Sequence, residues 1–137
     1  MILEHAAIWT DNLERLKEFY VKYLDGRSGK KYVNPNKNYE SYFISFGHGA
    51  RLELMTRPNL PDNQNDTISL QHKGIIHLAF ETSTKKEVDE KARLFALNGF
   101  EILDGPRITG DGYYEFVTLD PDKNRIEITT KDTSSPK

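Results

Sequence analysis

Arg51-Leu52-Glu53-Leu54 recurs further along the chain as Arg125-Ile126-Glu127-Ile128. Each copy follows a strand-like segment that carries one histidine: residues 3–8 precede the first copy, and residues 75–80 precede the second. The separation between histidine and glutamate is nearly the same in the two copies. The chain therefore contains one motif twice, which predicts two structurally equivalent halves.

Composition restricts the classes of function. A length of 137 residues suits one compact domain, or two small halves that share a core. The net charge of −2 gives no electrostatic footprint for nucleic acid or an acidic membrane, so neither is an expected partner. The chain has no cysteine, which excludes disulfides and thiol nucleophiles. No apolar run reaches the length of a membrane span and strand-like sequence starts at Ile2, so we expect no presequence and a cytoplasmic protein.

The first half predicts a strand, a helix and three further strands. The first strand is expected over residues 2–10, and the helix follows from Asp11, because Asp11-x-x-Glu14 is close to a capping box. Apolar residues at helical spacing continue as far as Gly26, which ends the run. Strands are expected around 31–33, at 41–46 and at 50–56.

The second half predicts the same order. A strand over 74–81 precedes the capping box Thr84-x-x-Glu87, and Asn98-Gly99 is a helix stop. Three strands are then expected, at 100–103, 113–119 and 125–130. The fold class is therefore α+β, with two βαβββ modules (about 1–57 and 73–130) in a single domain over 1–130, joined by the linker-like loop 57–71. Residues 131–137 are expected to form a polar, disordered tail.

The alternation of side chains along a strand predicts which residues can meet. His5, Glu53, His77 and Glu127 all have aliphatic neighbours on the reverse face of their strands, where the helices should pack. The simplest arrangement is a cup-shaped mixed sheet with helices on its convex side and these four side chains on its concave side. A single strand histidine is more often a hydrogen-bonded core residue, but two His and two Glu in equivalent places form the ligand set of a divalent metal site. His48 and His72 lie outside the repeat and are expected to be exposed.

At these residues the chain resembles the vicinal oxygen chelate superfamily, and within it the glyoxalase I (lactoylglutathione lyase-like) group. The resemblance spans about residues 1–130. Its landmarks are Leu3-Glu4-His5, Asn12-Leu13 through Glu18-Phe19-Tyr20, Leu52-Glu53-Leu54, Ile76-His77-Leu78, Gly105-Pro106-Arg107, and Asp120-Pro121-Asp122 through Ile126-Glu127.

The resemblance implies paired βαβββ modules around one divalent metal ion, usually in a homodimer. His5, Glu53, His77 and Glu127 fall on the four metal positions, and the ion would be Zn, Ni, Mn or Fe, among which mixed His and carboxylate ligands do not select sharply. The implied activity is that of a metal-dependent lyase or isomerase acting on a small substrate with vicinal oxygens through a metal-stabilised enolate. Glu127 is the expected catalytic base, with Glu53 second.

One position departs from the resembling group. Glyoxalase I proteins commonly carry an arginine four residues after the first metal ligand, and this chain has Trp9 there. An indole cannot replace a guanidinium for a carboxylate, so we expect an apolar wall, little glutathione-linked activity and a smaller or less anionic ligand.

Other residues are weaker candidates for the substrate site. Arg107, Tyr113 and Tyr114 flank the predicted turn 109–112, where they would either contact substrate or form a hairpin with structural aromatics. The basic residues Arg27, Lys30, Lys31 and Lys37 could steer an anionic substrate, although a solvated loop is the simpler interpretation.

Two other functions fit the same superfamily. An Fe(II) extradiol-type dioxygenase would use His5, His77 and Glu127 as a facial triad, but Glu53 would then be a fourth ligand at a site that oxygen needs open. A non-catalytic small-molecule or drug-binding resistance protein would need no metal ligands.

Overall fold

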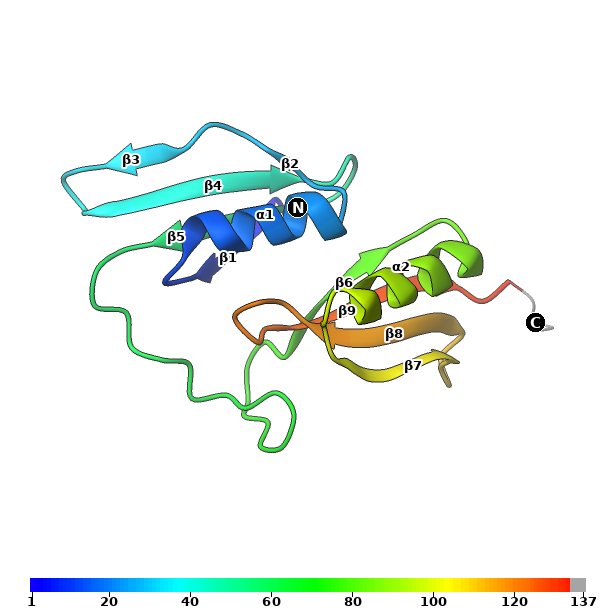
Figure 1. Ribbon diagram of the computed structural model, residues 1–137. Coiled ribbons are helices and arrows are strands. Elements are labelled where there is room, and N and C mark those ends of the chain that lie inside the picture. The colour runs from blue at the N-terminus through cyan, green and yellow to red at the C-terminus, as the bar shows by residue number, and fades with distance from the viewer. Residues whose placement is uncertain (134–137) are drawn as a thin grey trace. The chain divides into compact units, whose positions relative to one another are not determined.

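The computed structural model describes residues 1–133 and forms two compact units, Met1–Gln64 and Asn65–Lys137, each of which is described by itself. Each unit contains a β-strand, an α-helix and then further strands that return to pair with the first one (Figure 1). The α+β class with two βαβββ-like modules is therefore confirmed. No helix in the described part of the chain is long and apolar enough to cross a membrane.

The first unit is a mixed sheet with one helix. Its elements are β1 (His5–Trp9), α1 (Leu13–Tyr23), β2 (Arg27–Ser28), β3 (Tyr32–Asn34), β4 (Tyr39–Ser45) and β5 (Arg51–Thr56). The strand order is β1-β5-β4-β2, and β3 also pairs with β4. β1 runs parallel to β5, whereas the other pairs are antiparallel. The parallel pair is the consequence of the crossover through α1.

The core of the first unit lies between α1 and one face of its sheet. α1 buries Leu13, Leu16, Phe19 and Tyr20, and the sheet buries Ile44, Leu52 and Leu54. Fully burying an aliphatic side chain contributes about 1.5–3 kcal/mol, so this layer holds the helix in place. The helix begins one residue later than predicted, because Asn12 rather than Asp11 is the N-cap and accepts a hydrogen bond from the Arg15 amide.

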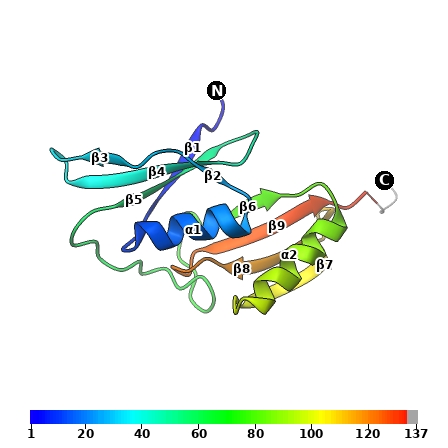
Figure 2. The same ribbon diagram turned by 45° about the horizontal axis from the view of Figure 1, so that its top comes forward.

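The second unit has the same plan (Figure 2). Its elements are β6 (His77–Glu81), α2 (Lys85–Leu97), β7 (Ile102–Ile108), β8 (Tyr113–Leu119) and β9 (Arg125–Lys131), with the strand order β6-β9-β8-β7. β6 runs parallel to β9. The capping box predicted at Thr84 and Glu87 is present, with both of its hydrogen bonds.

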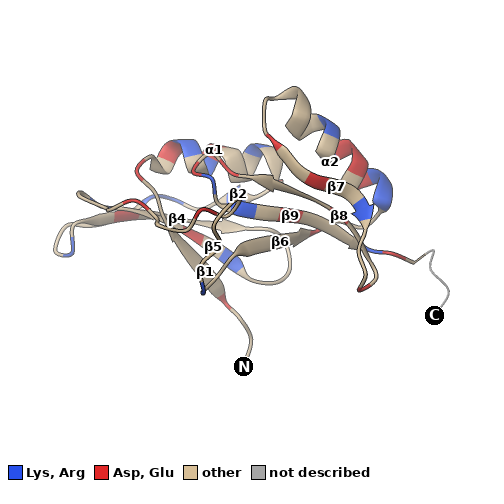
Figure 3. Ribbon diagram, turned by 90° about the horizontal axis from the view of Figure 1, so that it is seen from below, with Lys and Arg blue, Asp and Glu red and all other residues tan. Residues whose placement is uncertain are grey.

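The core of the second unit repeats that of the first. α2 buries Val88, Ala92 and Phe95. The sheet buries Phe116, Ile126 and Ile128, and the ring centroids of Phe95 and Phe116 are 5.7 Å apart. Acidic and basic residues are spread over both helices (Figure 3), away from these buried stripes.

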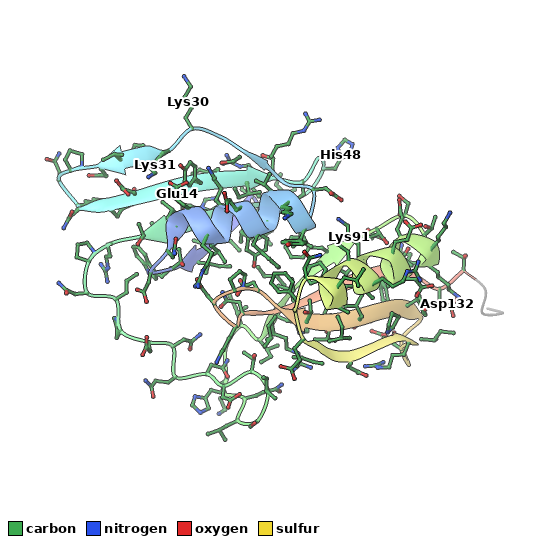
Figure 4. The ribbon with its side chains drawn as sticks, in the orientation of Figure 1. Glu14, Lys30, Lys31, His48, Lys91 and Asp132 are labelled. Carbon is green, nitrogen blue, oxygen red and sulfur yellow. The ribbon has the colours of Figure 1, made fainter. Side chains whose placement is uncertain are left out.

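Several element boundaries differ from the predictions, and β2 was not predicted. The first strand starts at His5 rather than Ile2, and the strand expected at 100–103 is displaced to Ile102–Ile108. Lys131, where the tail was expected to begin, belongs to β9. Asp132 is also fixed, since its carboxylate lies 2.5 Å from the Lys85 ammonium and its side chain is fully buried (Figure 4). Residues 134–137 of the expected tail lie outside the described residues.

Candidate metal centre

A histidine and a glutamate meet in the first unit. His5 on β1 and Glu53 on β5 come from neighbouring parallel strands, and His5 Nε2 lies 3.7 Å from Glu53 Oε1. Glu53 is largely covered, with 14% of its side chain exposed, whereas 39% of the His5 side chain is exposed. Leu52 and Leu54 point the other way into the core, so the predicted separation of faces holds in this unit.

The second unit contains the equivalent pair. His77 Nε2 on β6 lies 3.2 Å from Glu127 Oε1 on β9. The exposed fractions, 36% for His77 and 17% for Glu127, are close to those of the first pair. Ile126 and Ile128 on the reverse face are buried. The repeat seen in the sequence is therefore also a repeat of side-chain geometry.

Within each His–Glu pair, the distance between nitrogen and oxygen is close to that expected for two ligands of one divalent ion. Imidazole nitrogen and carboxylate oxygen bind such an ion at about 2.1 Å, so two of them lie about 3.0–3.4 Å apart at coordination angles of 90–109°. The separations of 3.7 Å and 3.2 Å are within a few tenths of an ångström of that range. Among residues 1–133 the structure shows no group of three or more His, Cys, Asp or Glu side chains that could hold a metal ion; within each unit, one histidine and one glutamate meet.

Sequence reasoning missed the residues that orient His5. Its Nδ1 donates a hydrogen bond to Glu4 Oε1 at 3.1 Å, which leaves the Nε2 lone pair on the side of Glu53. Arg51 holds the same carboxylate through both Nε, at 2.8 Å, and Nη2. The hydrogen bond from Arg51 lowers the pKa of Glu4 to about 2, with a smaller contribution from His5. A carboxylate behind a ligating histidine fixes its tautomer and ring orientation.

The second copy lacks this arrangement. Ile76 stands where the first copy has Glu4, so no carboxylate precedes His77. Arg125, the counterpart of Arg51, instead donates from Nη1 to the backbone carbonyl of Thr67 at 2.7 Å. The two copies of the motif therefore share their candidate ligands but differ in what surrounds them.

Glu115 is a further candidate that the sequence did not identify. In the β8–β9 register it faces Thr129, two residues from Glu127 and on the same side of the sheet. Burial raises the pKa of the Glu115 carboxyl, and the charge of Glu127 raises it further. The sequence could have revealed it, since Glu115 is the one charged residue of the segment 113–119.

The predicted substrate residues near this sheet have different outcomes. The Tyr114 hydroxyl donates to Asp89 on α2 at 2.6 Å, so this side chain lies on the helix side of β8. Tyr113 lies on the opposite side, with Glu115. Arg107 is opposite Glu115 in the β7–β8 register and remains a candidate, although its guanidinium is paired with Asp104 at 2.6 Å.

Trp9 lies beside a cation at the end of β1. It lies on the same face of β1 as His5, with 44% of its surface exposed. The guanidinium of Arg57, a residue expected in the linker, stands over the indole at 4.7 Å from the ring centroid. A cation therefore lies beside Trp9 at this end of β1, and the smaller or less anionic ligand stays a prediction. His48 and His72 are exposed, as predicted.

Comparison with protein families gives one match, which covers residues 2–128: the Glyoxalase/Bleomycin resistance protein/Dioxygenase superfamily. The chain belongs to this superfamily, whose members often bind divalent metals. An uncharacterised protein of Bacillus subtilis (strain 168), YqjT, is 33% identical over 58 residues, which are 40% of this chain and 45% of YqjT. The match thus spans less than half the length of that relative.

Solved structures agree with the family assignment at the level of the fold. The trypanothione-dependent glyoxalase I of Leishmania major has a TM-score of 0.77 and 21% identity, covering 98% of this chain and 89% of that one. A glyoxalase/bleomycin resistance protein/dioxygenase domain from Frankia sp. EAN1pec has a TM-score of 0.79 and 14% identity, with coverages of 96% and 98%. The lactoylglutathione lyase of Agrobacterium tumefaciens has a TM-score of 0.66 and 22% identity, with coverages of 93% and 92%.

Proposed function

We propose that this protein is a metal-dependent lyase or isomerase of the glyoxalase type that acts on a small substrate with vicinal oxygens. His5, Glu53, His77 and Glu127 together would hold one divalent ion, either within one chain or between the chains of a homodimer. The observation that carries this proposal is the pair of matching His–Glu contacts, 3.7 Å and 3.2 Å long, each backed by buried aliphatic residues. The superfamily to which the chain belongs includes glyoxalases.

Individual residues of the chain would have separate roles in the reaction. When bound, the divalent ion supplies a Lewis acid that polarises adjacent oxygens of the substrate. Glu127 is the proposed base that takes a proton from the neighbouring carbon, with Glu53 second. Glu115, whose carboxyl has a raised pKa on the same side of the sheet, is suited to hold a proton close to Glu127. Glu4 and Arg51 orient His5.

The two alternative functions have less support. A facial-triad dioxygenase would leave Glu53 without a role, yet Glu53 is the less exposed member of its pair and faces His5 Nε2. A pure drug-binding protein needs no ligand pair in each unit. Metal analysis and substrate assays distinguish both alternatives from the proposed function.

Metal analysis of protein purified without chelators tests the proposal. We expect one equivalent of Zn, Ni, Mn or Fe per complete site, and loss of that metal in His77→Ala and Glu127→Ala with unchanged far-UV circular dichroism. Glu4→Gln should keep the metal but weaken its affinity about tenfold or more, because the partner that orients His5 is lost. A screen of hydroxy-ketones and hemithioacetals follows on the loaded protein.

His48→Ala is the matched control, because it removes an exposed turn histidine outside both pairs (Figure 4). Its metal content should equal that of the wild type. Full metal occupancy in His77→Ala would show that the proposed ligand set is wrong. Oxygen-dependent ring cleavage of a catechol by the Fe(II)-loaded protein would favour the dioxygenase instead.

A further inference from the structure

Four side chains of the first unit form a closed set of contacts that includes His5. The Glu4 carboxylate lies 3.1 Å from His5 Nδ1 and accepts hydrogen bonds from Arg51. The Arg51 guanidinium lies over the Phe43 ring, 4.1 Å from its centroid. The Phe43 ring in turn meets the His5 imidazole, with centroids 5.2 Å apart and an angle of 84° between the planes. Each member of the set therefore contacts two others.

The strand register brings these side chains together. Phe43 on β4 is directly opposite Glu53 on β5, so its ring lies on the face of the sheet that carries His5. Arg51 is the register partner of His5 and lies on the same face. The Phe43 ring and the Glu4 carboxylate together restrict the rotation of the imidazole, and the side of the ring that bears Nε2 is left towards Glu53.

The second unit has no equivalent set. Ile76 stands at the place of Glu4, and Val117, opposite the second glutamate in the β8–β9 register, stands at the place of Phe43. Neither residue can accept a hydrogen bond from a histidine or stack with a guanidinium through its side chain. The two histidines of the repeat therefore differ in what holds them.

The hydrogen-bond partners predict a different tautomer for each neutral imidazole. His5 Nδ1 has an acceptor at 3.1 Å, whereas its Nε2 is 3.7 Å from Glu53 and so beyond hydrogen-bond distance. His77 Nε2 lies 3.2 Å from Glu127, and among residues 1–133 the His77 ring has no other hydrogen-bonding or charged partner. The proton is thus on Nδ1 in His5 and on Nε2 in His77. Nε2 of His5 is ready to bind an ion, but Nε2 of His77 must first lose its proton.

We propose that Arg51 and Phe43 are positioning residues that, with Glu4, hold His5 as the Nδ1–H tautomer before any metal arrives, so that the first unit's pair captures the divalent ion before the second. This inference deepens the proposed function and rests on it for one point, that both pairs bind a metal ion. A ligand that is already oriented loses less conformational entropy on binding and needs no proton transfer. His77 and Glu127 then complete the site.

Nitrogen NMR of the metal-free protein tests the tautomers directly. The chain has four histidines, and the variants His5→Gln and His77→Gln assign the two rings of interest. In mildly alkaline buffer, where imidazole is ordinarily neutral, we expect the His5 Nδ1 to have the chemical shift of an N–H nitrogen and the His5 Nε2 that of a bare nitrogen. The opposite assignment is expected for His77. The same tautomer in both rings would overturn the inference.

Three substitutions and one control test the positioning role. Arg51→Gln and Phe43→Leu should each change His5 to a mixture of the two tautomers, whereas Phe43→Tyr keeps the ring and should keep the wild-type shifts. Arg125→Gln is the matched control, because the same substitution at the equivalent place removes a contact with the Thr67 carbonyl and should leave both histidines unchanged. Unchanged far-UV circular dichroism shows that each variant is folded. Wild-type shifts of His5 in Arg51→Gln or in Phe43→Leu would exclude that residue as a positioning residue.

The order of capture is tested with variants that retain one pair. His77→Ala/Glu127→Ala keeps the first pair, and His5→Ala/Glu53→Ala keeps the second. In titrations with Zn²⁺ alone, followed through the same nitrogen shifts, we expect the first pair to bind about tenfold more tightly or better, the scale on which supporting residues change metal affinity. Adding Arg51→Gln to the first-pair variant should remove the difference. Equal or reversed affinities of the two pairs would overturn the order.

The outcome is separate from that of the proposed function. The tautomers are measured without metal, so the expected shifts support the positioning role of Arg51 and Phe43 even if the protein proves not to be a lyase or isomerase. Conversely, a protein that binds metal and turns over a substrate, but in which His5 and His77 have the same tautomer, would retain the proposed function and lose this inference.

Discussion

Ser41 and Thr118 are fully buried hydroxyl residues with opposite surroundings. Ser41 Oγ has no hydrogen-bond partner, whereas Thr118 Oγ1 donates to the Glu101 carbonyl at 2.6 Å. A buried polar atom without a partner contributes nothing to hold the fold, but a satisfied one costs about 1–3 kcal/mol to remove when its partner is left unpaired. We therefore expect Ser41→Ala to keep or slightly raise the free energy of unfolding, and Thr118→Val to lower it by about 1–3 kcal/mol.

Urea denaturation of the two variants and the wild type measures both effects under one set of conditions. The prediction fails if Ser41→Ala loses as much stability as Thr118→Val.

Alternation along strands predicted the faces of individual residues well, and the spatial neighbours of long side chains poorly. His5, Glu53, His77 and Glu127 lie opposite the buried aliphatic residues, as expected. The stacking of Arg57 on Trp9 could not be predicted, because Arg57 lies beyond its strand in what looked like linker sequence. The contact of the Tyr114 hydroxyl with Asp89 could not be predicted either, because the sequence does not specify how α2 packs on β8.

Helix α1 is tied to its sheet by a polar contact as well as by its apolar stripe. Glu14 accepts a hydrogen bond from the Tyr42 hydroxyl at 2.9 Å, and Lys31 Nζ lies 2.9 Å from the same oxygen (Figure 4). The hydrogen bonds from Lys31 and then Tyr42 lower the pKa of Glu14 from the ordinary 4.5 to about 2. The stabilisation from this lowered pKa is complete above pH 4.5 and is lost as the pH falls towards 2.

Glu14→Gln should therefore lower the free energy of unfolding at pH 7 by roughly 0.5–1 kcal/mol, the scale of exposed ion pairs, since half of the Glu14 side chain is exposed. The difference from wild type should shrink between pH 4.5 and about 2. Glu18→Gln is the control on an exposed position of the same helix. A pH-independent difference for Glu14→Gln would contradict the assignment.

Apart from the short β2, helices and strands were predicted in type and order, and their limits were predicted only where local chemistry specifies them. The capping box of α2 fixed one helix start, but in α1 two capping residues stand side by side and Asn12 is the one used. The strand predicted at 100–103 ended before Asp104-Gly105-Pro106, a sequence with the composition of a turn. In the structure Gly105 has φ +84°, and a Cβ there would lie 2.4 Å from the Glu115 carbonyl oxygen, so the strand continues through a position that only glycine fits.

At the scale of the whole molecule we expect a homodimer. In its own sheet β1 pairs only with β5 and β6 pairs only with β9, which leaves each with an unpaired edge. Natural proteins cover such edges, and pairing with a second copy is one way to do so. Sedimentation equilibrium at micromolar concentration should give twice the chain mass of 15.8 kDa. A monomer at that concentration would contradict the prediction and require that any complete metal site form within one chain.

The duplicated motif predicted two similar units, but nothing in the spacing of the sequence could specify how two ligand pairs combine. Each pair depends on one parallel strand contact within its own unit, β1 with β5 or β6 with β9. These contacts follow from the local βαβ crossover and are therefore predictable. How the two His–Glu pairs combine depends on the complementarity of surfaces, which a repeated sequence motif does not specify.

The arginine that opens both copies of the motif shows that the duplicated halves have diverged. Arg51 donates hydrogen bonds to the Glu4 carboxylate that orients His5. Arg125 instead donates to the backbone carbonyl of Thr67, in the segment that precedes β6. A chain made of two copies of the first module would have both histidines oriented by a carboxylate. It would lack the hydrogen bond that holds the segment before β6. A tandem of two second modules would have the reverse.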